Sequence, residues 1–323
     1  MQSLFIMPKL LVTYAIPQES FAEIRNQFEV ITPSSGSFSR EEVLRRLPEC
    51  EAMLSMFSFT VDRELIDAGA KLRIISNFGV GFNNVDIAYA KEKGIVVTNT
   101  PDPVIEPTAE LAFALMADLA RRVSECDAKL KRGSGLKWGV MENLGVGLWG
   151  TTLGVLGLGN IGRAVVRRAV CAGMNVIYHN RHRLAEAEEQ RLKVTYVSFE
   201  ELLRQSDYLS LHTPLNDSSY HIIDAVALRQ MKPSAYLINT ARGPVVDEAA
   251  LVEALRTGRL AGAGLDVYEF EPKISEELLT MDQVVLVPHI GTATMKGRIA
   301  MGRYACENIA RCFKGEEPLS RVV

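Results

Sequence analysis

The chain has 323 residues, 47% of them apolar, and a formal net charge of −3 at pH 7. This length and apolar content allow a large buried core and predict two domains. Lysine and arginine are dispersed along the chain and form no basic block, which excludes the charge pattern typical of nucleic-acid-binding proteins.

The cysteines and the apolar stretches indicate where such a protein works. Five cysteines without any C-x-x-C pair are typical of small buried residues in a reducing compartment. The opening stretch MQSLFIMPKL is interrupted by Pro8 and Lys9 too early to form the core of a signal peptide. Glu110 and Asp118 interrupt the best apolar stretch, so we expect no membrane-spanning helix. We therefore expect a cytoplasmic protein with no membrane partner.

The N-terminal third of the chain alternates short apolar runs with helical patterns. The apolar runs predict strands at Lys9–Tyr14, Glu29–Thr32, Ala52–Met56, Leu72–Asn77 and Ile95–Thr98. The segments between them predict helices at Pro17–Gln27, Ser39–Leu47, Val61–Asp67 and Asp86–Lys93. Such alternation is typical of a parallel sheet covered by helices on both faces. The proline-rich segment Thr100–Pro103 then predicts a domain boundary.

The next segment combines the longest predicted helix with an irregular arm. An apolar stripe predicts one helix from about Pro107 to Leu130. Residues Lys131–Gly150 show no clear period and contain both tryptophans, Trp138 and Trp149. A long irregular arm with aromatic side chains suits packing against another subunit. The alternative is a solvated loop.

A second series of strands and helices begins at Thr152. Its later strands are predicted at Asn175–Tyr178, Tyr208–His212, Ala235–Asn239, Gly262–Asp266 and Val284–Pro288. A last helix, Thr294–Lys314, is predicted beyond this sheet. Two sheets imply two lobes, and open α/β sheets bind their ligands at the carboxyl ends of the strands.

The turn after the first strand of this second series carries a glycine pattern. Gly157, Gly159 and Gly162 have G-x-G-x-x-G spacing, follow an apolar strand and open a helical pattern over Ile161–Ala172. Such a turn lets the backbone approach a pyrophosphate, which the free N–H groups and the dipole of the helix N-terminus favour. The pattern predicts a dinucleotide site, and a tight turn without a ligand is the alternative.

The residues after the next strand indicate which dinucleotide is bound. An acidic residue is usual about 20 positions after the glycines, where it binds the ribose hydroxyls of NAD. This chain has Asn180, Arg181, His182 and Arg183 there. A carboxylate would repel a 2′-phosphate, whereas arginine pairs with a phosphate through two hydrogen bonds. The loop therefore favours NADP(H), with NAD(H), or a merely solvated loop, as the alternatives.

Several reactive side chains follow predicted strands of the second sheet. Arg242 lies in INTARGPVVD, Glu271 in LDVYEFEP and His289 in VVLVPHIGTAT. An arginine fork suits the carboxylate of a 2-keto acid, and a histidine oriented by a carboxylate suits proton delivery to its carbonyl oxygen. Hydride transfer involves the nicotinamide, so we expect no metal. Spacing alone leaves His212 as an alternative to His289, and each of these residues could instead be structural or solvated.

These segments resemble the D-isomer-specific 2-hydroxyacid dehydrogenase family. The resemblance covers nearly the whole chain and is carried by GLGNIG…GMNVIYHNR, INTARGPVVDEAAL with GAGLDVYEFEP, and VPHIGTAT. It implies an α/β fold of two flavodoxin- or Rossmann-like lobes with doubly wound parallel sheets, the nucleotide lobe being inserted into the substrate lobe. The substrate lobe would comprise residues 1–101 and 294–323. The nucleotide lobe would comprise 102–293, with a dimerisation helix and arm at 107–150.

The resemblance also implies roles for individual residues. It assigns catalysis to Arg242, Glu271 and His289, and so chooses His289 over His212. The segment SNFGVGFNN matches a turn that binds the substrate carboxylate. The substrate residues implied are Leu54, Ser55, Met56, Val80, Gly81, Arg242 and Trp138, the last matching an aromatic that reaches the partner subunit's active site. The cofactor residues implied are Thr108, Gly157, Gly159, Asn160, Ile161, Gly162, Asn180, Arg181, Arg183, His212, Thr213, Pro214, Thr240, Ala241, Asp266, His289 and Gly291.

Within the family, the chain is most similar to the glyoxylate/hydroxypyruvate and 2-ketogluconate reductases, in which an Asn-Arg loop accompanies NADPH. The resemblance thus implies a homodimeric reductase that converts a small 2-keto acid to the D-2-hydroxy acid. The alternatives are a D-lactate or aryl-pyruvate dehydrogenase and a dinucleotide-sensing binding protein like the co-repressors that share this fold. An inactive scaffold would lack Arg242, Glu271 or His289. Phe270 stands where a proline is common in the family, and no regulatory domain is expected after Val323.

Overall fold

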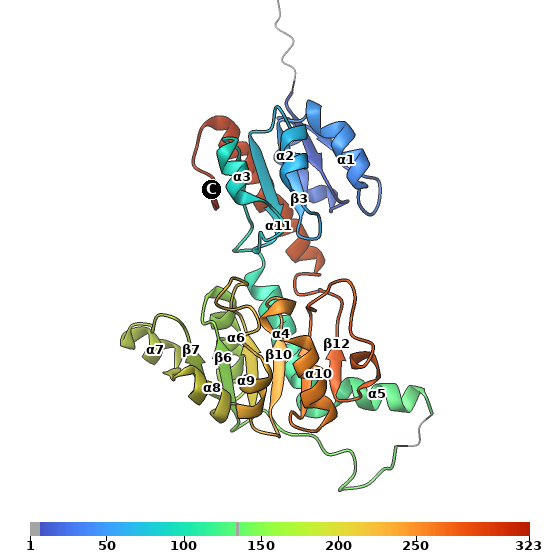
Figure 1. Ribbon diagram of the computed structural model, residues 1–323, viewed down its shortest axis with the longest axis vertical. Coiled ribbons are helices and arrows are strands. Elements are labelled where there is room, and N and C mark those ends of the chain that lie inside the picture. Colours follow the sequence, from blue (N-terminus) through green and yellow to red (C-terminus); the bar gives the residue numbers. More distant parts are fainter. Residues whose placement is uncertain (1–6, 134–135) are drawn as a thin grey trace, which may run out of the picture. The chain divides into compact units, whose positions relative to one another are not determined.

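The computed structural model describes residues 7–133 and 136–323; the beginning of the predicted substrate lobe (1–6) and two residues of the predicted arm (134–135) lie outside the described residues. The chain divides into two compact units (Figure 1). One unit contains the chain up to Val104 together with Thr292–Val323, and the other contains Ile105–Gly291. The second unit therefore interrupts the first in sequence, close to the proline-rich segment Thr100–Pro103.

The first unit is built on a five-stranded parallel sheet. Its strand order is β2-β1-β3-β4-β5. The strands are Lys9–Val12 (β1), Glu29–Ile31 (β2), Ala52–Met56 (β3), Ile74–Phe78 (β4) and Val96–Thr98 (β5). This is the order of flavodoxin-like sheets. Both β3 and β4 are buried along their whole length, as central strands of a covered parallel sheet are.

The helices of the first unit begin where the sequence supplies caps. α1 (Arg40–Arg46) begins at a capping box, and α2 (Arg63–Ala68) and α3 (Ile87–Glu92) begin at aspartate caps. The last helix, α11 (Met295–Lys314), packs against β4. The helix predicted at Pro17–Gln27 is wrong. Only a short 3-10 helix, η1 (Gln18–Phe21), forms, because the N–H groups that follow bond alternately three and four residues back.

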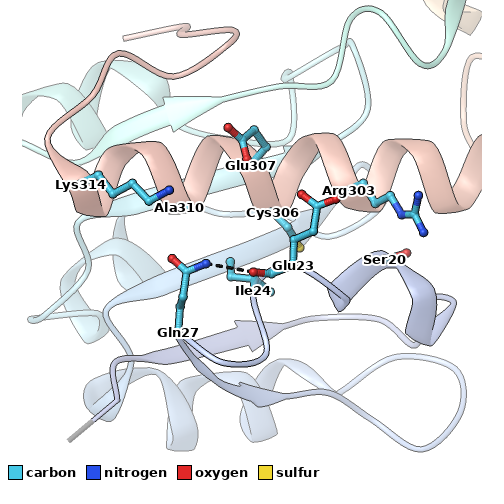
Figure 2. Close-up of a pocket in the computed structure, with 9 residues that line it drawn as sticks. All are labelled: Ser20, Glu23, Ile24, Gln27, Arg303, Cys306, Glu307, Ala310 and Lys314. Carbon is cyan, nitrogen blue, oxygen red and sulfur yellow. Dashed lines mark hydrogen bonds between the residues drawn. The ribbon is translucent and has the colours of Figure 1, made fainter. Parts of the chain in front are cut away.

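A small cavity of about 110 Å³ lies in the first unit between the segment after η1 and α11 (Figure 2). Its wall is mixed in charge, with Glu23, Glu307, Arg303 and Lys314 among the lining residues. None of the predicted catalytic, substrate-binding or cofactor-binding residues lines this cavity. The cavity therefore gives no support for a keto-acid or dinucleotide site at this place.

The second unit is built on a seven-stranded parallel sheet of order β12-β11-β10-β9-β6-β7-β8. The strands are Thr152–Leu156 (β6), Asn175–His179 (β7), Thr195–Tyr196 (β8), Tyr208–Leu211 (β9), Tyr236–Asn239 (β10), Gly262–Leu265 (β11) and Val284–Leu286 (β12). The strand order reverses between β6 and β9, and open α/β sheets bind dinucleotides at such a point. Two parallel α/β units confirm the predicted fold class.

Helices cover both faces of the second sheet (Figure 1). α4 (Ile105–Arg121) and α6 (Asn160–Cys171) share one core, and α8 (Phe199–Gln205), α9 (Ala225–Gln230) and α10 (Glu248–Arg256) share another. Leu237 and Ile238, successive residues of β10, belong to different cores, because side chains alternate between the faces of a strand. In the described ranges, no helix is long and apolar enough to cross a membrane.

The single helix predicted at Pro107–Leu130 is wrong, because the helix is interrupted. α4 ends at Arg121 and α5 (Val123–Lys131) begins after Arg122, whose φ of 53° is left-handed. Asp118 accepts hydrogen bonds from the backbone N–H (2.7 Å) and the hydroxyl of Ser124. This side-chain acceptor gives the N–H of Ser124 a partner outside the helical ladder, so the helix turns there.

The arm after α5 exposes large apolar side chains. Trp138 is 91% exposed and Trp149 is 84% exposed. α5 itself buries none of its residues. The described part of α5 and the arm therefore leaves much of its apolar surface exposed.

Candidate active site

A histidine and a carboxylate meet beyond the ends of β11 and β12. His289 Nδ1 lies 2.9 Å from Glu271 Oε2. The other oxygen of Glu271 accepts a hydrogen bond from the backbone N–H of Tyr268 at 3.0 Å, so the carboxylate is held at both ends. Phe270, the departure from the family pattern, is 65% exposed and does not displace Glu271 from this pose. When it is protonated, an imidazole held through Nδ1 by a carboxylate carries the transferable proton on Nε2.

The ionisation of Glu271 reflects its histidine partner. Burial alone would raise the pKa of Glu271, but the hydrogen bond from His289 and its positive charge lower the pKa below the usual value. Glu271 therefore remains a carboxylate at neutral pH. This is the state that orients an imidazole and stabilises its protonated form.

Arg242 follows β10 and is held by its own turn. Asn239 accepts from the N–H of Ala241 at 3.0 Å and donates to the carbonyl of Arg242 at 2.9 Å. Burial lowers the pKa of Arg242, and the nearby Glu271 carboxylate acts in the opposite direction. The guanidinium remains charged. Among the described residues it forms no ion pair within 4.0 Å, which suits a site for a substrate anion.

Asp266 joins the end of β11 to the loop of His289. Its two carboxylate oxygens accept hydrogen bonds from the N–H groups of Ile290 (2.5 Å) and Gly291 (2.9 Å). The N–H of His289 donates to the Asp266 carbonyl at 2.9 Å. Burial raises the pKa of Asp266. The aspartate therefore fixes the backbone from which the imidazole projects.

The glycine turn lies at the point where the strand order reverses. Gly157 has φ 95°, and a Cβ there would lie 2.7 Å from the carbonyl carbon of His212 at the end of β9. A Cβ on Gly162 would lie 2.5 Å from the carbonyl oxygen of Gly157. Gly159 caps α6 without any side-chain bond, and a Cβ there would meet nothing within 4 Å. The first N–H groups of α6 thus stand beside open space, as an anion site at a helix N-terminus requires.

Other predicted cofactor residues lie around the same strand ends. Thr240 follows β10, and its buried hydroxyl has no hydrogen-bond partner within the described part of the chain. Thr108 lies on α4 with its hydroxyl 3.5 Å from the position of a Cβ on Gly291. Buried polar groups are rarely left unsatisfied, so the Thr240 hydroxyl and the Gly157 turn together fit a bound dinucleotide.

The two arginines of the loop Asn180–Arg183, called the specificity loop below, have different partners in the structure. Arg183 donates to both oxygens of Glu189, at 2.9 and 2.7 Å, and Glu189 is buried on α7 (Glu186–Leu192). Arg181 is exposed and makes no hydrogen bond or ion pair with the described residues. Asn180 accepts from the N–H of Leu158 at 2.6 Å and so ties the loop to the glycine turn. Of these two arginines, only Arg181 has a guanidinium without a partner among the described residues.

The predicted substrate residues of the first unit lie at its own strand ends. Leu54, Ser55 and Met56 end β3, while Val80 and Gly81 form the turn after β4. The carbonyls of these two turn residues accept side-chain hydrogen bonds, Val80 from Asn99 (2.8 Å) and Gly81 from Asn77 (2.6 Å). Sequence reasoning missed both asparagines, although each follows or ends a strand. Trp138, the remaining predicted substrate residue, lies on the exposed arm of the second unit.

His212 has a different environment from His289. Its Nε2 is 2.8 Å from the Ser210 hydroxyl, and burial lowers its pKa to about 4. A neutral histidine at pH 7 is a poor proton donor. The geometry therefore favours His289, the alternative that spacing alone left open.

The depressed pKa of His212 predicts a pH-dependent stability. Between about pH 6.5 and 4 the unfolded chain binds a proton at this residue that the folded chain does not, so stability falls as the pH falls. The loss across that window is on the order of 3 kcal/mol. Urea unfolding at pH 7.5 and 5 should show a smaller difference in His212→Gln than in the wild type. His182→Gln, an exposed histidine, is the control, and an unchanged difference in His212→Gln would refute the assignment.

Comparisons with known proteins bear on this site. The family model for the NAD binding domain of D-isomer specific 2-hydroxyacid dehydrogenases matches residues 113–291. The glyoxylate reductase of Thermococcus litoralis is 43% identical over 316 residues, which cover 96% of this chain and 95% of that protein. A solved glyoxylate reductase from Paecilomyes thermophila has a TM-score of 0.87 and 35% identity, over 98% of each chain. An NADPH-dependent glyoxylate/hydroxypyruvate reductase from Sinorhizobium meliloti, solved with NADP and malonate, has a TM-score of 0.85 and 32% identity, over 98% of this chain and 97% of that one.

Proposed function

Because the chain belongs to the D-isomer-specific 2-hydroxyacid dehydrogenase family, we propose that it uses NADPH to reduce glyoxylate to glycolate, which is achiral, or hydroxypyruvate to its D-2-hydroxy acid. Family membership makes it an oxidoreductase with a nicotinamide dinucleotide cofactor, acting on small 2-keto acids. The His289–Glu271 pair, with Arg242 close enough to affect the ionisation of Glu271, is the observation that carries the proposal.

The dinucleotide is held by the second unit. In our proposal the N-terminus of α6 and the Gly157 turn bind the pyrophosphate, and Thr240 and Asp266 lie toward the nicotinamide end. The bound nicotinamide supplies the hydride. These groups follow β6, β10 and β11, whose carboxyl ends lie at one edge of the same parallel sheet, so one cofactor can reach them all.

The chain's own side chains bind the keto acid and move the proton. Arg242 pairs with the substrate carboxylate through its planar fork. His289 donates the proton on Nε2 to the carbonyl oxygen as the carbonyl carbon is reduced, and Glu271 stabilises the charged imidazole beforehand. Arg242, Glu271 and His289 thus lie on the loops after three adjacent strands, β10, β11 and β12.

The first unit carries the other proposed substrate residues. The Val80–Gly81 turn has its carbonyls engaged by Asn99 and Asn77, and this orients the turn so that its N–H groups are available to a carboxylate. Leu54, Ser55 and Met56 shape the pocket for the substrate side chain. We propose that the first unit is the substrate unit, and that the second unit binds the cofactor and carries Arg242, Glu271 and His289.

The exposed arm of the second unit is proposed as the contact of a homodimer. Its support is the near-complete exposure of Trp138 and Trp149 on a segment that buries little of its own surface. Trp138 would then reach the active site of the other subunit. We propose NADPH over NADH because Arg181, and no acidic residue, stands exposed at the ribose position.

A steady-state screen tests the proposed function. Glyoxylate, hydroxypyruvate, pyruvate, phenylpyruvate and 2-ketogluconate are each assayed with NADPH and with NADH. We expect the highest kcat/KM with glyoxylate or hydroxypyruvate and NADPH. A preference for pyruvate or phenylpyruvate would instead identify a D-lactate or aryl-pyruvate dehydrogenase. NADPH binding without reduction of any keto acid would favour a dinucleotide-sensing protein.

A further inference from the structure

A second histidine–carboxylate pair lies next to the catalytic loops. His221 Nε2 is 2.8 Å from Glu269 Oε1. The two side chains are mostly buried, with exposed fractions of 28% and 10%. The ring of Tyr220 stacks on the imidazole, with the ring centres 4.0 Å apart. The mechanism above uses neither member of the pair, although Glu269 stands two positions before Glu271.

The start of α10 holds Glu269 from its other side. Glu269 Oε2 accepts from the N–H of Glu248 at 3.1 Å, and the N–H of Glu269 donates to Glu248 Oε2 at 2.9 Å. Glu248 is itself buried and accepts from the N–H of Ser275 at 3.2 Å. These reciprocal bonds fix both the backbone and the side chain of Glu269. They therefore fix the turn that leads to Glu271.

His221 also contacts the loop that carries Arg242. Its N–H donates to the carbonyl of Pro244 at 2.8 Å. Its φ of 49° is left-handed, a conformation that a side chain with a Cβ adopts only when its surroundings hold it. Gly243 packs so tightly on the opposite loop that a Cβ would lie 1.8 Å from the carbonyl oxygen of Tyr268. His221 thus joins the two loops, one through its backbone and the other through its ring.

We propose that His221 and Glu269 are positioning residues that clamp the Arg242 loop against the segment of Glu271. The N–H of Tyr268 donates to Glu271 at 3.0 Å, so the backbone fixed by Glu269 also aims the carboxylate that orients His289. The inference rests on the proposed function. Without the clamp, the carboxylate-binding guanidinium and the proton donor lose their fixed relation, which weakens substrate binding and turnover together.

The test compares His221→Ala with the conservative His221→Gln. Glutamine Nε2 can take the place of imidazole Nε2 as the donor to Glu269. With glyoxylate and NADPH, we expect His221→Ala to raise KM about tenfold and to lower kcat about tenfold, and His221→Gln to restore most of both. The Kd for NADPH, from fluorescence titration, should change by less than about twofold. The alkaline limb of the pH profile of kcat/KM should move to lower pH in His221→Ala, because a displaced Glu271 stabilises the protonated donor less.

Asp224→Ala is the matched structural control. Asp224 caps α9 from the same loop through Val226 and Ala227 and contacts neither Glu269 nor Pro244. We expect it to lower the Tm without changing KM, kcat or the pH profile. If His221→Ala does not fold, Glu269→Gln is assayed in its place, with the same direction expected.

Two results would overturn the clamp. One is an active wild type whose His221 and Glu269 variants change only the Tm, as Asp224→Ala does. In that case the proposed function stands and the positioning role falls. The other is a wild type that reduces none of the keto acids, which overturns both the proposed function and the clamp.

Discussion

Replacing His289 by asparagine is expected to lower kcat by about 100-fold or more while the affinity for NADPH stays unchanged. The imidazole is the proposed proton donor, and an amide does not give up a proton at neutral pH. The substitution is mild for the fold, because asparagine tolerates the φ of 51° at this position. Its amide can also keep a hydrogen bond to Glu271. Turnover at saturating glyoxylate measures the effect on kcat, and fluorescence titration with NADPH measures the effect on cofactor affinity.

A turnover near that of the wild type would remove His289 from the mechanism. His212 would then be the next donor to test, against the handicap that burial lowers its pKa to about 4. A loss of NADPH affinity that accounts for the whole effect would likewise contradict the assignment.

The meeting of His289 and Glu271 could be predicted because it follows from topology. Both residues follow apolar runs that predict parallel strands, His289 directly and Glu271 after a short turn, and the carboxyl ends of such strands lie at one edge of the sheet. The glycine turn was also predictable, because the G-x-G-x-x-G spacing after an apolar strand indicates positions where only glycine lets the backbone approach its neighbours. Local signals therefore placed these residues at the edge of the sheet, whereas the choice of His289 over His212 came from the family resemblance.

The hydrogen-bond partners of individual side chains were not predictable. The break at Arg122 depends on Asp118 accepting from Ser124, which competes with a helical pattern that is otherwise uninterrupted. Asn99 reaches the carbonyl of Val80 only because β4 and β5 pair side by side. The hydrogen-bond partner of a side chain depends on which groups the fold places near it. The pattern of apolar residues in the sequence does not determine which groups these are.

The specificity loop illustrates this limit most clearly. Two arginines, Arg181 and Arg183, looked equivalent in the sequence. The structure places Arg183 on Glu189, a buried carboxylate of α7 that also accepts from the Tyr178 hydroxyl at 2.6 Å. An arginine already paired with a buried carboxylate would have to abandon it to bind a phosphate. We therefore propose that Arg183 anchors the loop and that Arg181 binds the 2′-phosphate.

Arg181→Ala is accordingly expected to lower kcat/KM for NADPH by about ten- to a hundredfold, because an arginine–phosphate bond contributes roughly 1.5–3 kcal/mol. The kcat/KM for NADH should hardly change, since NADH has no 2′-phosphate. Added salt should weaken the NADPH preference of the wild type, because the pair is exposed and therefore screened. Steady-state assays with both cofactors and one good keto acid measure all three quantities.

Arg183→Ala is the matched control on the same loop. It leaves Glu189 buried without its cation, so we expect a lower Tm and similar losses with NADPH and NADH. A selective loss of NADPH efficiency in Arg183→Ala, with none in Arg181→Ala, would reverse the two roles. A wild type that prefers NADH would contradict the reading of the loop altogether.

Adding Asn180→Asp to Arg181→Ala should change the cofactor preference from NADPH to NADH. The asparagine oxygen already accepts from the N–H of Leu158 at 2.6 Å, and an aspartate can keep that bond with one oxygen. Its second oxygen can then accept from the ribose hydroxyls of NADH, while its charge repels a 2′-phosphate. We expect the combined Asn180→Asp and Arg181→Ala variant to prefer NADH. An equal loss with both cofactors would instead mean that Asn180 serves only to tie the loop to the glycine turn.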